Sequence, residues 1–333
     1  MPFNVISGIG SNQDLVEELS RIDARLVKAP VWIEDDIISN ARDADAVMAA
    51  NIEPYTRRVI QALKKCKVIS RMGAGYDNID VAAATEEGIP VAYIPDASIA
   101  EVSDHALALL LALSRKIITV DRLVKRGAWQ MGNREIYDAR IPMYRLSEQT
   151  VGVVGAGKIG SAFIGKAKAL GLKVIVYDPY LSAESAKKLG AAPVDFERLL
   201  HESDYVSLHA PLTNETRHLF NIKAFKKMKP TAYIINTSRG ELINEKDLII
   251  TLTEHVIAGA GLDVTEPEPP SPDNPLIKLD NVIITAHSGF YSEHALKELR
   301  LRTAGAVVMA LRGEWPPIIA NPEVKERSNR RIR

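Results

Sequence analysis

Short apolar runs alternate with amphipathic stretches in the first hundred residues of the chain. An apolar run at residues 44–48 precedes a helical pattern over residues 55–63, and a second apolar run follows at residues 68–70. This alternation is typical of βαβ units, in which helices connect parallel strands. We therefore predict a parallel sheet in this part of the chain.

The alternation starts again at Val151, after a long helical pattern over residues 98–126 and a polar segment, residues 127–149, that we interpret as a loop. Six apolar runs follow, at residues 151–154, 174–177, 205–208, 232–235, 256–262 and 282–285. Six strands joined by helices suffice for a second, doubly wound sheet.

The last part of the chain shows one more long helical pattern, from residue 290 to residue 311. The basic segment at residues 326–333 is interpreted as a disordered tail. A chain of 333 residues exceeds the usual size of one domain, so we expect two domains.

The composition and charge of the chain indicate which kind of molecule it binds. Hydrophobic residues make up 46% and charged residues 25% of the chain, which is typical of a globular protein. The 42 Lys and Arg residues are balanced by 42 Asp and Glu residues, so no net field attracts nucleic acid or a membrane surface. We expect a small-molecule partner, and neither a nucleic acid nor a membrane.

Cys66 is the only cysteine, which excludes an intramolecular disulfide and a cysteine-rich metal site. We predict no metal. The longest apolar run, residues 106–113, is far shorter than the roughly 18 residues that a membrane span requires. No signal peptide is visible at the N-terminus, and we expect a cytoplasmic location.

A glycine-rich segment follows the first strand of the second series. It places three glycines at GxGxxG spacing between an apolar run and a helical pattern: Gly155, Gly157 and Gly160, with Lys158 and Ile159 between the last two. These glycines allow a tight turn and close approach of a pyrophosphate to a helix N-terminus. In this context the pattern predicts a dinucleotide site.

Asp178 follows the next strand of the series. An acidic side chain at this place can accept hydrogen bonds from both ribose hydroxyls and repels a 2′-phosphate. Pro179 and Tyr180 come next, so no arginine follows at once to receive such a phosphate. The predicted cofactor is therefore NAD rather than NADP.

Polar residues follow the remaining strands, at the edge of the sheet where ligands bind in open α/β folds. Strand-end polar residues are common, but these occur together: His209, Thr237, Arg239, Asp263 and His287, with Pro211 two residues after His209. A 2-keto acid needs a fixed cation and a proton donor. Arg239 can bind the carboxylate through its planar fork, and His287 can give and take a proton near neutral pH. Glu268 can hold His287 in its charged form.

The segment Arg71 to Asn78 is rich in small residues, among them Gly73, Ala74 and Gly75. Successive backbone N–H groups in such a turn can bind a carboxylate. An ordinary glycine-rich turn before a helix explains the same residues. Both interpretations stay open.

Together these motifs resemble the D-isomer-specific 2-hydroxyacid dehydrogenase family over residues 71–321. The segments that carry the resemblance are residues 73–80, 155–160, 206–213, 236–240, 261–264, Glu268 with Pro269, and 285–287. The resemblance implies an NAD-dependent enzyme that interconverts D-2-hydroxy acids and 2-keto acids, and it implies a homodimer. Arg239, Glu268 and His287 would be its catalytic residues, and Asp263 would face the nicotinamide amide.

The fold implied by this resemblance is α/β, with two doubly wound parallel sheets. A Rossmann NAD domain, residues 99–288, would be inserted into a flavodoxin-like substrate domain, residues 1–98 and 289–333. The proposed cofactor residues all fall in the inserted domain.

Within the family, residues 71–75 and 287–293 look most like the C-terminal-binding-protein-like branch, whose members include transcriptional corepressors. By this resemblance Arg71 and Phe290 shape substrate choice, although the branch usually has Trp at position 290. Ala286 stands where the family mostly has Pro, so we expect a less rigid loop before His287.

Two other functions stay open. In an NAD(H)-sensing corepressor or interaction module, the same site would bind the cofactor but catalyse no reaction. A phosphite-type dehydrogenase would have the same three catalytic residues. Formate dehydrogenases share the fold but carry Gln where this chain has Glu268, which argues against them.

Overall fold

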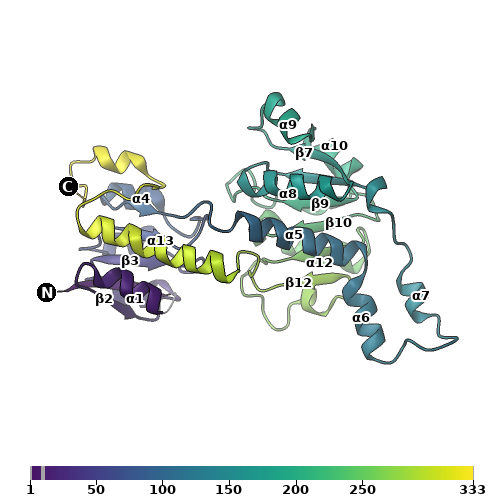
Figure 1. Cartoon of the computed structure of the whole chain (residues 1–333), viewed down its shortest axis with the longest axis horizontal. Coiled ribbons are helices and arrows are strands. Elements are labelled where there is room, and N and C mark those ends of the chain that lie inside the picture. Colours follow the sequence, from purple (N-terminus) through teal and green to yellow (C-terminus); the bar gives the residue numbers. More distant parts are fainter. Residues whose placement is uncertain (1, 9–11, 333) are drawn as a thin grey trace. The chain divides into compact units, whose positions relative to one another are not determined.

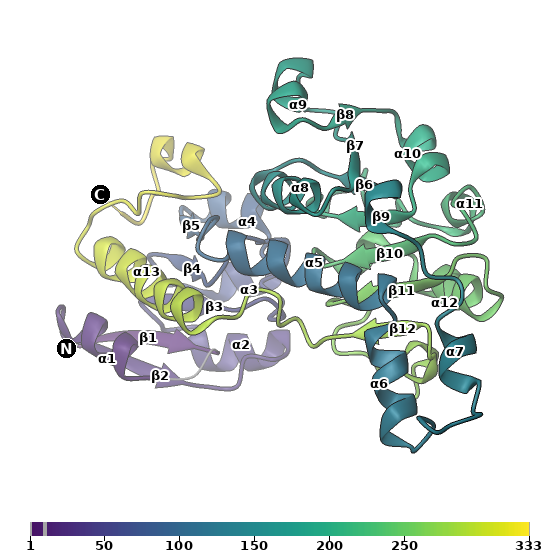
Figure 2. The ribbon, with the colours of Figure 1, turned by 45° about the vertical axis from the view of Figure 1, so that its right-hand side comes forward.

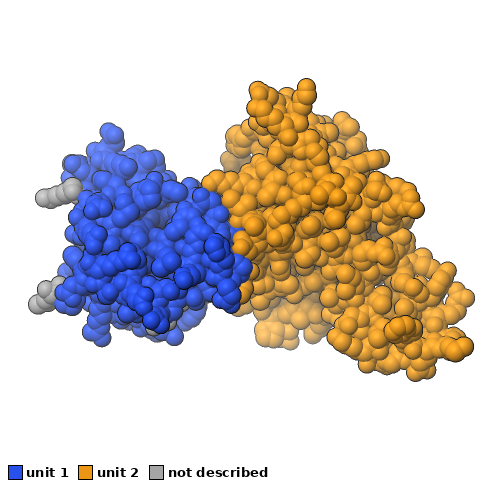
Figure 3. Space-filling model, viewed as in Figure 1, with its two compact units in different colours: residues 1–98, 292–333 blue, residues 99–291 orange. Residues whose placement is uncertain are grey.

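Two parallel sheets organise the chain, one in each of its two units (Figure 1). The computed structural model describes residues 2–8 and 12–332. Residues 1–98 and 292–333 form unit 1, and residues 99–291 form unit 2 (Figure 3). The chain therefore leaves unit 1 at the start of a helix and returns to it just before another.

Unit 1 contains a five-stranded parallel sheet with the order β2-β1-β3-β4-β5. Its strands are β1 (Phe3–Ser7), β2 (Ala24–Lys28), β3 (Ala46–Ala49), β4 (Ile69–Arg71) and β5 (Val91–Ala92). This order is that of the flavodoxin-like folds and confirms the predicted fold of this part of the chain.

Helices cover both faces of this sheet (Figure 2). Along β3, Ala46 and Met48 point into the core that includes α13, whereas Val47 and Ala49 point into the opposite core. Burial on both faces explains why the strands read as continuous apolar runs. The helices of unit 1 are α1 (Gln13–Ser20), α2 (Glu34–Ala41), α3 (Arg57–Ala62), α4 (Val81–Glu86) and α13 (Glu293–Leu311), followed by the 3₁₀ helix η4 (Pro322–Glu326).

The prediction of a disordered tail was wrong for residues 326–332. The Arg331 guanidinium donates hydrogen bonds to the carbonyl oxygens of Leu63 at 2.7 Å and Lys64 at 2.8 Å, and its Nε donates to that of Glu87 at 3.0 Å. Ile332 is buried, with 1% of its surface exposed. The tail is ordered because Arg331 satisfies carbonyl groups at and beyond the end of α3 that lack helical partners.

Unit 2 contains a seven-stranded parallel sheet with the order β12-β11-β10-β9-β6-β7-β8. The first half of the unit supplies β6, β7 and β8 on one side, and the second half supplies the other four strands, as in a Rossmann fold. This confirms the predicted fold of unit 2. Its strands are β6 (Thr150–Val154), β7 (Lys173–Tyr177), β8 (Ala192–Pro193), β9 (Tyr205–Leu208), β10 (Tyr233–Asn236), β11 (Gly259–Leu262) and β12 (Val282–Ile284).

The long helical pattern at residues 98–126 forms two helices rather than one, since Lys116 adopts a left-handed φ of 52° between them. The expected loop at residues 127–149 also contains a short helix. The helices of unit 2 are α5 (Ile99–Ser114), α6 (Ile117–Lys125), α7 (Glu135–Ala139), α8 (Lys158–Ala169), α9 (Ala183–Leu189), α10 (Phe196–Glu202), α11 (Ile222–Phe225) and α12 (Glu245–Thr253), with 3₁₀ helices η1 (Leu146–Glu148), η2 (Gly240–Leu242) and η3 (Pro275–Lys278).

The helices of unit 2 build one core on each face of the sheet. Residues of α5 and α8, such as Leu109 and Phe163, pack on one face. Residues of α10 and α12, such as Leu199 and Leu248, pack on the other. Among the described residues, no helix is long and apolar enough to cross a membrane.

Candidate functional site

The turn from β6 to α8 can hold a dinucleotide phosphate. Gly155 has a φ of +90°, and a Cβ there would lie 2.8 Å from the nitrogen of Ala210. A Cβ at Gly160 would clash with the carbonyl oxygen of Gly155. Only glycine fits at these two positions, because the turn packs against the loop after β9 and against itself.

Gly157 is the N-cap of α8, and no side chain caps the helix there. Nothing lies within 4 Å of a Cβ built on Gly157. Lys158 and Ile159 form the first turn of α8, so their backbone N–H groups lie at the positive end of the helix dipole. This open helix N-terminus fits a pyrophosphate.

Asp178, directly after β7, is tied to the glycine-rich turn. Its Oδ2 accepts a hydrogen bond from the N–H of Ala156 at 2.8 Å, and its Oδ1 accepts one from the N–H of Tyr180 at 2.9 Å. An ionised carboxylate has about four acceptor positions, so two are left for ribose hydroxyls. The structure thus brings Asp178 beside the turn that was predicted to bind the phosphates.

Two polar atoms at the ends of β9 and β10 are buried without a partner among the described residues. They are Nδ1 of His209 and Oγ1 of Thr237. Nε2 of His209 lies 2.9 Å from Oγ of Ser207, and burial lowers the pKa of His209 to about 3, so the imidazole is neutral at neutral pH. Unsatisfied buried polar atoms need an explanation, and a bound cofactor supplies one. These residues, with the glycine-rich turn, fit NAD.

Pro211 lies in the exposed segment that follows His209. Its carbonyl oxygen accepts a hydrogen bond from Oγ1 of Thr216 at 2.7 Å. This bond closes a local turn at the end of β9, on the same edge of the sheet as the glycine-rich turn.

The structure brings Glu268 and His287 together. Nδ1 of His287 lies 2.5 Å from Oε1 of Glu268, and their side chains are 22% and 27% exposed. The pair leaves Nε2 as the ring atom of His287 that Glu268 does not engage. A carboxylate in this position orients the imidazole.

Arg239 lies in the turn after β10. Asn236 donates from Nδ2 to the carbonyl oxygen of Arg239 at 2.8 Å, and a guanidinium nitrogen of Arg239 donates to the carbonyl oxygen of Ser238 at 2.8 Å. A Cβ at the next residue, Gly240, would clash with the carbonyl of Thr265. The Arg239 turn is therefore packed directly against the loop that leads to Glu268.

Asp263 is buried at the end of β11 and binds the loop that carries His287. Its Oδ1 accepts from Oγ1 of Thr285 at 2.5 Å and from the N–H of Ser288 at 2.9 Å, and its Oδ2 accepts from the N–H of Gly289 at 2.8 Å. Burial raises the pKa of the Asp263 carboxyl, but hydrogen bonds from His105, Thr285 and these two N–H groups outweigh burial and hold the pKa well below its ordinary value. The carboxylate is charged at neutral pH.

His105, on α5, completes this cluster and was not predicted from the sequence. Its Nε2 lies 2.8 Å from Oγ1 of Thr285 and 3.4 Å from Oδ1 of Asp263. The available signal was a histidine directly before the apolar run at residues 106–113 of a buried helix. That signal identifies no partner, because the partner is far away in the sequence.

The predicted substrate residues are divided between the units. Arg71, at the end of β4 in unit 1, is 6% exposed, and its guanidinium donates to the carbonyl oxygen of Met72 at 2.5 Å. Gly73 has a φ of +137°, and a Cβ there would clash with this guanidinium. Ala74 and Gly75 continue the same turn. Phe290 belongs to unit 2, where its ring centroid lies 6.4 Å from that of Tyr291.

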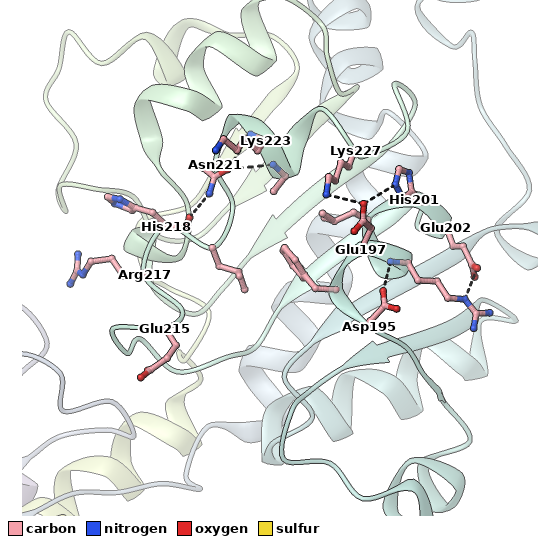
Figure 4. Close-up of a pocket in the computed structure, with 15 residues that line it drawn as sticks. Asp195, Glu197, His201, Glu202, Glu215, Arg217, His218, Asn221, Lys223 and Lys227 are labelled. Atoms are coloured by element: carbon pink, nitrogen blue, oxygen red, sulfur yellow. Dashed lines mark hydrogen bonds and ion pairs between the residues drawn. The ribbon is translucent and has the colours of Figure 1, made fainter.

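A surface groove between α10 and the segment leading into α11 contains none of the predicted site residues (Figure 4). Charged side chains along it pair with one another. Lys227 lies 2.9 Å from Glu197, and Arg198 lies 2.6 Å from Glu202. Paired, exposed charges of this kind offer no concentrated field for a ligand. Within the described part of the chain, no group of three or more His, Cys, Asp or Glu side chains could hold a metal ion.

Comparisons with known proteins agree with this geometry. Residues 107–289 match the family model described as D-isomer specific 2-hydroxyacid dehydrogenase, NAD binding domain. A glyoxylate reductase of Korarchaeum cryptofilum is 38% identical over 288 residues, which cover 86% of this chain and 86% of that protein. A D-3-phosphoglycerate dehydrogenase of Methanocaldococcus jannaschii is 39% identical over 308 residues, 92% of this chain and 56% of that protein.

Among solved structures, a D-lactate dehydrogenase from Aquifex aeolicus, complexed with NAD and lactic acid, superposes with a TM-score of 0.81 at 27% identity. The superposition covers 93% of this chain and 96% of that one. None of these three proteins is named as a corepressor or a phosphite dehydrogenase, so the comparisons do not favour those alternatives. They also do not place the chain in the C-terminal-binding-protein-like branch.

Proposed function

The chain belongs to the D-isomer-specific 2-hydroxyacid dehydrogenase family, and we propose that it interconverts small 2-keto acids and D-2-hydroxy acids with Arg239, Glu268 and His287 as its catalytic residues. It is an NAD-dependent oxidoreductase that acts on CH–OH groups. The observation that carries the proposal is the 2.5 Å contact between Nδ1 of His287 and Oε1 of Glu268, in the unit that also holds the glycine-rich turn.

The proposed roles follow from the chemistry of each side chain. Arg239 binds the substrate carboxylate through its planar fork. His287, oriented by Glu268, donates a proton from Nε2 to the carbonyl oxygen of the keto acid and takes it back from the hydroxyl in the reverse direction. When bound, NADH supplies the hydride that reduces C2. Glu268 acts on His287 and transfers no proton to substrate.

The cofactor is NAD, and we propose which residues hold it. Backbone N–H groups of the turn and of the first residues of α8 bind the pyrophosphate, and Asp178 binds the ribose. His209, Pro211, Thr237 and Asp263 lie at the ends of the neighbouring strands. The proposed cofactor residues are Gly155, Gly157, Lys158, Ile159, Gly160, Asp178, His209, Pro211, Thr237 and Asp263.

We propose that unit 2 is the NAD domain and unit 1 the substrate domain. Arg71, the turn of Gly73, Ala74 and Gly75, and Phe290 would then shape substrate choice, as their resemblance to family motifs implies. The names of the relatives make glyoxylate, pyruvate and 3-phosphohydroxypyruvate the first acids to test.

A steady-state assay of NADH oxidation against this panel of 2-keto acids tests the proposed function. We expect turnover with at least one acid, and formation of the D-enantiomer from any acid whose product is chiral. Absence of turnover with every acid, in a protein that still binds NADH, would contradict the proposal and favour a cofactor sensor.

A homodimer and a cytoplasmic location remain parts of this proposal. The segment that contains α6 and α7 exposes large apolar side chains: Trp129 is 80%, Met131 104% and Tyr137 53% exposed. An apolar surface of this kind is typical of a protein interface. Measurement of the molar mass in solution, with Trp129→Glu beside the wild type, tests whether a second copy of the chain covers it.

A further inference from the structure

The loop that carries His287 is held in an unfavourable backbone conformation. His287 has a φ of +48°, in the left-handed region that side chains other than glycine rarely adopt. Ala286, directly before it, is exposed and does not fix the backbone as a proline would. Other contacts must therefore keep the loop in place.

Asp263 supplies most of these contacts. Its carbonyl oxygen accepts a hydrogen bond from the N–H of His287 at 2.8 Å. Its carboxylate accepts from Thr285, Ser288 and Gly289, as described above. One residue of β11's C-terminal end thus binds the loop on both sides of His287.

His105 fixes this carboxylate and Thr285 from the other side. The Thr285 hydroxyl has a single proton, and it donates that proton to Oδ1 of Asp263 at 2.5 Å. Nε2 of His105, 2.8 Å from the same hydroxyl oxygen, must then be the donor in its contact with Thr285. The chain of donors therefore runs from His105 through Thr285 to Asp263.

His105 also lies close to the far end of the loop, at Gly289. A Cβ built on Gly289 would lie 3.4 Å from Cγ and Cδ2 of His105 and 2.8 Å from Oδ2 of Asp263. The His105 side chain is 24% exposed, so most of its surface is covered. The imidazole of His105 thus hydrogen-bonds with Thr285, before His287, and lies close to Gly289, after it.

We propose that His105 is a positioning residue for His287, acting through Thr285 and Asp263. The inference rests on the proposed role of His287 as the acid/base. A proton donor must be aligned with the carbonyl oxygen within a fraction of an ångström, and a displacement of about 1 Å can lower a rate by about a hundredfold. His105 therefore matters for proton transfer although it transfers no proton itself.

Three substitutions separate this role from a merely structural one. His105→Leu removes the donor but keeps an apolar side chain, and we expect kcat for keto-acid reduction to fall roughly tenfold, as for the loss of one ordered hydrogen bond. His105→Gln can still donate to Thr285 and should keep kcat within about twofold. Thr285→Val breaks the same donor chain and should reproduce the His105→Leu loss.

Two readouts report on the loop and on proton transfer. In His105→Leu, amide hydrogen exchange in residues 285–291 should become faster and the solvent deuterium isotope effect on kcat should increase, while the Kd for NADH stays within about twofold. His201→Leu, on the exposed part of α10, serves as the control and should change none of these values. A protein in which His105→Leu leaves kcat and exchange unchanged, or in which His105→Gln fails as severely as His105→Leu, would overturn the proposal.

A double-substitution cycle distinguishes failure of this proposal from failure of the proposed function. In a His287→Gln background, His105→Leu should lower the residual turnover by less than about twofold, because residues that act as a unit are not additive. A full tenfold further loss would show that His105 acts independently of His287 and overturn the inference. If His287→Gln itself leaves turnover unchanged, the role of His287 fails instead.

Discussion

Nδ1 of His287 lies 2.5 Å from Oε1 of Glu268, although 19 residues separate the two along the chain. The loops after β11 and β12 meet at this point because the two strands are neighbours in the parallel sheet. This contact gives the imidazole of His287 a defined orientation, as its proposed role as proton donor requires. Its consequences can be measured one residue at a time.

Substitution of Glu268 by Gln should lower kcat for keto-acid reduction by about ten- to a hundredfold. The amide keeps the size of the side chain but removes the negative charge that faces Nδ1 of His287. Steady-state kinetics with saturating NADH measure the effect, and Glu254→Gln, at an exposed position after α12, is the matched control. Equal activity of both variants would argue against the pairing.

Arg239→Lys should raise the KM for the keto acid roughly ten- to a hundredfold. A lysine keeps the positive charge but cannot form two parallel hydrogen bonds with a carboxylate. The KM and the NADH affinity are measured side by side, with Arg217→Lys as the control. A KM that stays within about twofold of the wild-type value would assign carboxylate binding to another residue.

For cofactor choice, we use Asp178→Asn, whose amide oxygen can still accept the hydrogen bond from Ala156 while the amide nitrogen cannot accept the one from Tyr180. Loss of the negative charge removes the repulsion of a 2′-phosphate. The ratio of kcat/KM for NADH to that for NADPH should fall about tenfold or more. Retention of the full preference would show that a different residue sets it.

His209 links protein stability to pH. Because burial lowers its pKa from 6.5 to about 3, the folded state keeps the imidazole neutral while the unfolded chain takes up a proton below about pH 6.5. The free energy of unfolding should therefore fall by about 1.4 kcal/mol per pH unit between pH 6 and pH 4 from this group alone. Above about pH 6.5 the imidazole is neutral in both states, so this group causes no loss of stability there.

Denaturant unfolding of the wild type and His209→Gln at several pH values tests this linkage. The wild type should lose stability relative to the variant as the pH falls. His294→Gln, at a position with 86% of the side chain exposed, should run parallel to the wild type. Parallel curves for all three proteins would mean that His209 is hydrated in the folded state.

The sheets could be predicted from the sequence because their strands are buried on both faces. The run at residues 205–208 matches β9, and the runs for β6, β7 and β12 differ from the observed strands by one residue at an end. β8 was missed because it is only two residues long and contains Pro193, at the edge of the sheet. Two residues are too few to show the hydrophobic periodicity from which a strand is predicted.

The gathering of polar side chains at one edge of the sheet of unit 2 could also be predicted, since a parallel sheet brings its carboxyl ends together. His105 could not, because a helical histidine has no positional relation to Thr285 or Asp263 until the fold is known. The break at Lys116 was missed because it depends on a left-handed backbone conformation, which the hydrophobic period does not show. The ordered tail was missed because Arg331 binds carbonyl groups that are far away in the sequence.

The most direct test of the proposed function compares His287→Gln with the wild type in two measurements on the same preparations, the turnover of a 2-keto acid and the Kd for NADH. We predict that turnover falls by at least about a hundredfold while the Kd for NADH stays within about twofold, because the imidazole acts in proton transfer and not in cofactor binding. Retained turnover, or an equal loss of turnover and of NADH affinity, would contradict the assignment of His287 as the acid/base.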